Sequence, residues 1–108
     1  MYDIKYWADE NRRQPVVDYI ESLKWSEQRK FLAGVERIKQ DGPNLKRPTA
    51  DYLGGKLGLW ELRVFKYRIL YTFIGKTAWF LHAFLKKTSE IPQQEINTAL
   101  RRKEGIEK

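Results

Sequence analysis

Apolar and polar residues alternate with a period of two from Leu59 to Leu85, and this run constrains the fold more than any other feature. Successive side chains of a β-strand point to opposite faces of a sheet, so the alternation predicts half-buried strands. The run divides into strands at 59–65, 67–74 and 77–85. Gly75-Lys76 suits a type II′ hairpin turn, whereas Phe65-Lys66 is a weaker turn signal because neither residue favours positive φ. We therefore expect three consecutive antiparallel strands.

Helical spacing prevails outside this run. The other expected elements, in chain order, are a short strand at 2–7, a helix at 15–23 opened by a proline, a helix from about 26 to 42 with Ser26 as its N-cap, a short strand around 52–53, and a final helix opened by Pro92. The sequence predicts one α+β domain, residues 1–108: a small antiparallel sheet packed on an N-terminal helix hairpin, with a C-terminal helix. The second face of the sheet should stay at least partly open.

A two-residue turn at Phe65-Lys66 sets the register of the strands that it joins. Apolar residues then pair on the helix-facing side, as Val64 with Tyr67, Leu62 with Ile69, and Trp60 with Tyr71. On the opposite side Arg63 lies directly across from Arg68. Like charges in opposite positions destabilise a sheet, but an anion between them would turn the repulsion into binding. The planar guanidinium fork of arginine holds phosphate through two parallel hydrogen bonds.

The same reasoning at the Gly75-Lys76 turn gives a register for the next strand pair. It places Ala83 beside Arg68, and it brings Lys87 to the face of the two arginines. It also places His82 beside Ile69 as a buried core residue on the helix-facing side. A bulge or a longer loop at Gly75 would instead move His82 to the open face, where it could act as a general base.

Most of the excess positive charge falls in this strand region. The segment 54–87 contains Lys56, Arg63, Lys66, Arg68, Lys76, Lys86 and Lys87 against the single acid Glu61, in a chain of net charge +7. Cations among strand residues indicate a sheet face that binds a polyanion, most readily nucleic acid. A solvated charged face, in which Glu61 pairs with one of the arginines, is the simpler alternative. Among the aromatic residues, only Phe65, at the turn, is not assigned to the core.

Several classes of site are excluded or disfavoured by composition. The chain contains no cysteine, which excludes disulfides, thiolate metal sites and a cysteine nucleophile. Its single histidine has no second histidine at metal-binding spacing, so we expect no metal and no cofactor. The N-terminus lacks an apolar signal core, and the longest apolar stretch, 78–85, is too short to cross a membrane. We expect a cytoplasmic protein.

Several segments together resemble the phage-derived HigB-like branch of the RelE/ParE toxin superfamily. They are Pro15-Val16-Val17-Asp18-Tyr19-Ile20, Leu59-Trp60-Glu61-Leu62-Arg63, Tyr67-Arg68-Ile69-Leu70-Tyr71, Leu81-His82-Ala83-Phe84-Leu85-Lys86-Lys87-Thr88, Pro92 and Glu95-Ile96. The similarity covers roughly residues 2–104, and the order of the segments is more specific than any one of them.

The resemblance implies the toxin of a type II toxin–antitoxin pair that cuts mRNA on the ribosome without a metal. A protein antitoxin with a helix-turn-helix domain would be its partner. By this resemblance Arg63, Arg68 and Lys87 match basic catalytic or RNA-holding positions, and Lys86 is a weaker match. We expect Lys56, Lys66 and Lys86 to bind RNA around that cluster, with Lys87 or His82 transferring protons.

Two other functions fit the same superfamily. One is a ParE-like toxin that binds and poisons DNA gyrase without being an enzyme, and the other is an inactive nucleic-acid-binding remnant. Fold alone does not separate these functions. The basic pair favours RNA cleavage, because a gyrase-binding protein has no need of a phosphate clamp.

Overall fold

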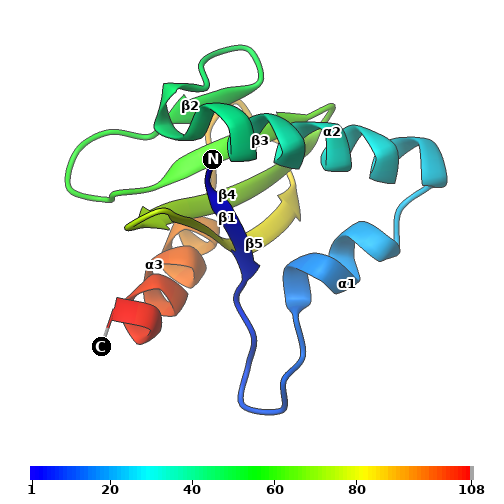
Figure 1. The fold of residues 1–108 in the computed structure, drawn as a ribbon. Helices are drawn as coiled ribbons and strands as arrows, with labels where there is room; N and C mark the ends of the chain where they lie inside the picture. Colours follow the sequence, from blue (N-terminus) through cyan, green and yellow to red (C-terminus); the bar gives the residue numbers. More distant parts are fainter. Residues whose placement is uncertain (108) are drawn as a thin grey trace.

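The computed structural model describes residues 1–107 and shows an α+β fold of one five-stranded mixed sheet and three α-helices (Figure 1). The elements are β1 (Asp3–Tyr6), α1 (Pro15–Glu21), α2 (Trp25–Asp41), the 3₁₀ turn η1 (Gly42–Asn44), β2 (Ala50–Tyr52), β3 (Trp60–Val64), β4 (Tyr67–Ile74), β5 (Thr77–Leu85) and α3 (Gln93–Glu107). The predicted element order is confirmed. The second helix begins at Trp25, so the predicted N-cap at Ser26 is wrong.

The sheet has the strand order β1-β5-β4-β3-β2. Strands β2 to β5 pair antiparallel, as the alternation predicts, but β1 pairs with β5 in parallel. The prediction of a purely antiparallel sheet is therefore wrong at this edge. The two helices that follow β1 carry the chain to the opposite edge of the sheet, where β2 begins. This long connection between β1 and β5 allows the two strands to pair in parallel.

Helices α1 and α2 cover one face of the sheet. Their buried residues Val16, Ile20, Phe31 and Ile38 pack against sheet residues such as Leu62 in the larger core. Proline at the first position of α1 suits a helix start, because the missing N–H has no partner there. Helix α1 lies mainly against β5 and α2 mainly against β3, so the predicted antiparallel hairpin of these helices stays a prediction.

Helix α3 packs on the other face of the sheet, opposite α2 (Figure 1). A second core lies beneath it, formed by the buried residues Leu59, Leu70, Leu81, Phe84 and Ala99. The expected open face is therefore open only beyond the area that α3 covers. Within residues 1–107, no helix is both long enough and apolar enough to cross a membrane.

The predicted register of β3 and β4 is confirmed. Val64 pairs with Tyr67, Leu62 with Ile69, Trp60 with Tyr71, and Arg63 with Arg68. The residue Phe65 does adopt a positive φ of 55°, although the residue type disfavours it. The hydrophobic period and the short turn together were enough to set this register.

The predicted register of β4 and β5 holds only as far as Tyr71 and Phe80. A bulge there inserts one extra residue in β5, so that Leu70 pairs with His82 and Arg68 with Phe84. The predictions that Arg68 neighbours Ala83 and that His82 lies beside Ile69 are therefore wrong. The extra residue allows both Leu81 and His82 to face α3, which is the usual effect of a bulge on side-chain direction.

Candidate nucleic-acid interface

Arg63 and Arg68 lie opposite each other on adjacent strands and share the α3 face of the sheet. Glu61 precedes Arg63 by two residues, so strand alternation gives it the same face. Arg63 Nε donates a hydrogen bond of 2.7 Å to Glu61 Oε1, and Arg68 Nε lies 3.7 Å from Glu61 Oε2. We call Glu61, Arg63 and Arg68 the arginine–glutamate cluster.

Glu61 changes the interpretation of the two arginines. Its side chain is only 2% exposed, and it forms ion pairs with both guanidinium groups. The repulsion between Arg63 and Arg68 is therefore offset inside the protein, without a bound anion. The simpler expectation, that Glu61 pairs with one arginine, understates what the structure shows.

Asp51 on β2 adds a second carboxylate to the edge of the cluster. It pairs across the strands with Glu61, and its Oδ2 lies 3.5 Å from Arg63 Nη2 and 2.8 Å from Arg47 Nη2. The hydrogen bond from Arg47 lowers the pKa of Asp51. Sequence reasoning missed both residues, because it placed the β2 strand one to two residues too late. Three arginines and two carboxylates leave this region with a net positive charge.

The two arginines differ in what they can offer a ligand. Arg68 Nη1 donates to the carbonyl oxygens of Phe65 and Tyr67 at 2.8 and 2.9 Å, and the Arg68 side chain is 14% exposed. Burial lowers the pKa of Arg68 from its ordinary value. The Arg63 side chain is twice as exposed, at 29%. Arg68 therefore holds the turn, and Arg63 is the more accessible cation.

The predicted lysines do not all gather at this cluster. Lys66 lies in the turn after β3, and its carbonyl accepts a hydrogen bond from the Lys86 backbone N–H at 2.8 Å. Continuing the alternation of β5 from Phe84 assigns Lys86 to the face of Arg68 and Lys87 to the other face. The register that placed Lys87 on the face of Arg68 is wrong because of the bulge; since β5 ends at Leu85, the face of Lys87 itself stays a prediction. Lys56 is exposed in the loop before β3, at the opposite end of that strand from Lys66.

His82 is held beneath α3. Its Nε2 lies 3.0 Å from Glu95 Oε1, Arg102 Nη1 lies 3.5 Å from its Nδ1, and its ring stacks on Phe84. Only 18% of the side chain is exposed. The predicted hydrogen-bonded histidine is found, but on the face opposite to the predicted one.

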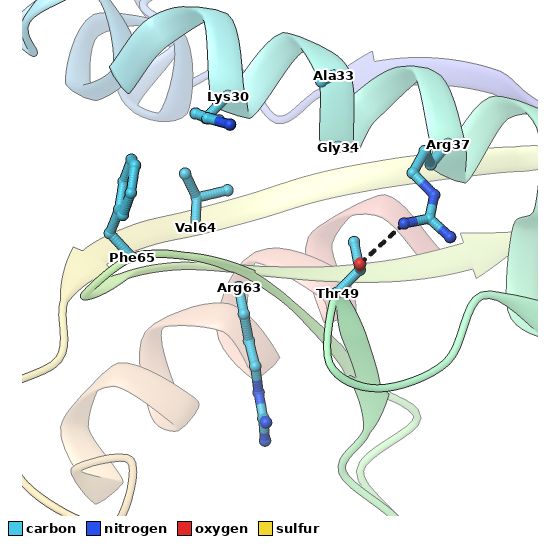
Figure 2. A pocket seen from close by; sticks show the side chains of 8 residues that line it. All are labelled: Lys30, Ala33, Gly34, Arg37, Thr49, Arg63, Val64 and Phe65. Atoms are coloured by element: carbon cyan, nitrogen blue, oxygen red, sulfur yellow. Dashed lines mark hydrogen bonds between the residues drawn. The ribbon is translucent and has the colours of Figure 1, made fainter. Parts of the chain in front are cut away.

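A hollow lies between α2 and the end of β3, on the α2 side of the sheet (Figure 2). It has a volume of about 350 Å³ and is lined by Lys30, Ala33, Gly34 and Arg37 of α2 and by Thr49, Arg63, Val64 and Phe65. Arg37 Nη1 donates to Thr49 Oγ1 at 3.0 Å. In Figure 2 the guanidinium of Arg63 points away from α2 and from the other lining side chains. Arg63 thus links the hollow to the arginine–glutamate cluster around the edge of β3.

The lining residues of α2 were not foreseen from the sequence. Lys30, Ala33 and Arg37 follow each other at helical spacing, which places two cations and a small residue on one side of α2. This spacing was visible in the sequence, but only the tertiary structure shows that this side of α2 lies beside β3. Among residues 1–107, no group of three or more acidic or histidine side chains could hold a metal ion.

Comparison with known proteins identifies the family of the chain. The model of the phage-derived Gp49-like protein family (DUF891) matches residues 18–104, which include α2, every strand except β1, and most of α3. A search of the curated proteins gave no match. Because the match spans most of the chain, the protein belongs to the phage-derived Gp49-like family.

Proposed function

We propose that this protein is the toxin of a type II toxin–antitoxin pair and acts as a metal-independent endonuclease on mRNA at the ribosome. The observation that carries the proposal is the pairing of Arg63 and Arg68 around the buried Glu61. Membership of a phage-derived family and the resemblance to HigB-like toxins support the same function.

RNA cleavage without a metal needs positive charge at the phosphate that is attacked by the neighbouring 2′-OH. Arginine remains charged throughout such a reaction, and fixed cations stabilise the charge that develops in the transition state. Arg63 is the residue that we assign to the phosphate, because its side chain is 29% exposed while Glu61 fixes its direction. Arg68 is the second cation and also positions the turn.

Glu61 acts in this proposal as a positioning residue. A carboxylate that is 2% exposed does not reach a substrate, but its hydrogen bond holds Arg63 Nε in one orientation. Preorganised charges of this kind need no rearrangement when the reaction begins. The ion pair also keeps two guanidinium groups close together in the absence of RNA.

Proton transfer falls to a lysine at the end of β5. The attacking 2′-OH gives up its proton to water as the new P–O bond forms, and an ammonium group can protonate the leaving 5′-oxygen as the old P–O bond breaks if it lies within hydrogen-bond reach. We assign this role to Lys86, since the bulge gives it the face of Arg68, and Lys87 is the alternative. His82 is the less suitable candidate because Glu95 already holds its Nε2.

The partners follow from the same proposal. The net charge of +7 suits both the RNA of the ribosome and an acidic surface on a helix-turn-helix antitoxin. Both partners would act in the cytoplasm.

The test is induced expression followed by mapping of RNA 5′ ends, with and without active translation. The native chain should create new 5′ ends in translated mRNA only. Arg63→Gln should remove most of them, and the matched change Arg13→Gln, in the exposed loop before α1, should leave them unchanged. Arrest of growth with damaged DNA and no new RNA ends would contradict the proposal and favour a gyrase poison. Harmless expression would favour an inactive remnant.

A further inference from the structure

Phe65 occupies a backbone position that is unfavourable for its residue type. It is the first residue of the two-residue turn between β3 and β4, and its φ is +55°. Glycine is the usual choice there, because a side chain in the left-handed region meets the backbone. The ring is 64% exposed and so adds little to the core. Stability of the fold therefore gives no reason for phenylalanine at this position.

The turn that carries the ring is held firmly. Arg68 Nη1 donates to the carbonyl oxygen of Phe65 at 2.8 Å and to that of Tyr67 at 2.9 Å. The backbone N–H of Lys86 donates to the carbonyl oxygen of Lys66 at 2.8 Å. The backbone that carries the exposed ring is thus held in place before any ligand arrives, which reduces the entropy lost on binding.

Basic side chains line the surface beside the ring. Figure 2 shows Lys30 above Phe65 at one end of the hollow and the bonded pair Arg37 and Thr49 at the other. An adjoining hollow of about 370 Å³ shares Lys30 and adds Arg29. Within the described chain, neither hollow has an acidic side chain in its lining. An aromatic ring beside a groove of cations is the arrangement that binds single-stranded nucleic acid.

We infer that these hollows bind the backbone of single-stranded RNA and that Phe65 stacks on one of its bases. This inference rests on the proposed function and adds a binding track to it. Lys30 and Arg37 contact phosphates along α2, and the strand then passes around the edge of β3 to Arg63. Pairing of β2 with β3 ends at Leu62, and one further hydrogen bond joins the Arg63 N–H to the Thr49 carbonyl, so this contact does not reach Val64 at the edge. Stacking requires an accessible base, which excludes duplex RNA.

The binding experiment separates stacking from charge. The full chain is titrated into two fluorescent oligomers of equal length, and the anisotropy of each is measured. One is a single-stranded 2′-O-methyl RNA that cannot be cleaved, and the other is an abasic oligomer with the same number of phosphates. Phe65→Gly should weaken binding of the RNA by about 10- to 100-fold and leave binding of the abasic oligomer unchanged. The same variant should unfold at the same or a higher temperature, because glycine relieves the positive φ.

Three further variants complete the design. Phe65→Trp should keep the affinity for RNA, since it retains a stacking surface. The double change of Lys30 and Arg37 to glutamine should weaken binding of both oligomers and reduce the dependence of the affinity on salt. Leu32→Ala, which removes a side chain that is 60% exposed elsewhere on α2, is the matched control and should change neither affinity.

Several outcomes would overturn the inference. They are unchanged RNA affinity of Phe65→Gly, an equal loss for both oligomers, and no RNA binding by the native chain. Binding of a glutamate-rich peptide in place of RNA, with the same dependence on Phe65, would assign the hollow to an acidic protein. Because the RNA probe cannot be cleaved, these results are independent of nuclease activity. Normal mRNA cleavage by Phe65→Gly would remove the stacking role and leave the proposed function intact.

Discussion

Replacing Glu61 with glutamine tests whether the arginine–glutamate cluster is held together as the structure indicates. The change is nearly isosteric, but it removes the only charge between Arg63 and Arg68 in the cluster's buried interior. Two guanidinium groups in opposite positions of neighbouring strands are then left without that counter-charge. Within residues 1–107, Asp51, at 3.5 Å from Arg63, is the remaining carboxylate that forms an ion pair with either arginine and offsets part of the repulsion.

The magnitude follows from burial and distance. Glu61 is 2% exposed, whereas the arginines are 29% and 14% exposed, so solvent screens the pairs only in part. Two unit charges about 4 Å apart attract by roughly 4 kcal/mol at an effective dielectric constant of 20. Breaking a buried pair by removing one partner costs about 3–5 kcal/mol, and partial exposure of the arginines reduces this. We expect Glu61→Gln to lower the free energy of unfolding by about 3 kcal/mol.

The assay is urea unfolding of the native chain and the variant at neutral pH, followed by tryptophan fluorescence. The expected loss corresponds to a fall of roughly 10–20 °C in melting temperature for a domain of this size. The matched control is Glu36→Gln, which breaks a surface pair with Lys39 at 3.8 Å whose side chains are 61% and 37% exposed. That change should lower the free energy of unfolding by less than about 0.5 kcal/mol. Equal losses for the two variants would refute the reasoning.

Two further predictions concern the fold and its dependence on pH. Gly42→Ala should lower the free energy of unfolding by more than about 2 kcal/mol, because the φ of Gly42 is +54° and an added Cβ would lie 2.3 Å from Tyr2 Cε1. The matched change Gly105→Ala in α3, where an added Cβ meets open space, should raise the free energy of unfolding by up to about 1 kcal/mol. Thermal melts of the two variants and the native chain measure both effects. Because the hydrogen bond from Arg47 lowers the pKa of Asp51, its stabilisation should be present above the ordinary pKa of 3.8 and disappear as pH falls through the lower value in the fold. Asp51→Asn should therefore destabilise by at most about 1 kcal/mol at pH 6 and by progressively less as the pH falls below 3.8; an equal loss at every pH would contradict this account.

The sequence allowed the centre of the sheet to be predicted because local signals agree there. Alternation and the two-residue turn fix the pairing of Arg63 with Arg68, and β3 and β4 adopt that register. A bulge that moves His82 to the other face was one alternative at the sequence level, but no local signal favoured it or placed it near Leu81; contacts of Leu81 and His82 with α3 accompany it in the fold. One extra residue then exchanged the predicted faces of the residues that follow it.

Long-range contacts explain the rest of what the sequence did not indicate. The parallel pairing of β1 with β5 joins segments more than seventy residues apart, and no local pattern encodes it. The hollow likewise combines Lys30 and Arg37 of α2 with Phe65 after β3. Glu61 was visible as a possible partner of one arginine, but its burial between both became clear only in the folded chain.

The most direct test of the central claim is the rate of mRNA cleavage in a reconstituted translation reaction. The native chain, Arg63→Gln and Arg13→Gln are compared at equal folded concentrations, under conditions in which all three remain folded. If Arg63 contacts the phosphate, Arg63→Gln should cleave about 10²- to 10³-fold more slowly, and Arg13→Gln should match the native rate. Equal rates for the native chain and Arg63→Gln would contradict the proposed role of the arginine pair.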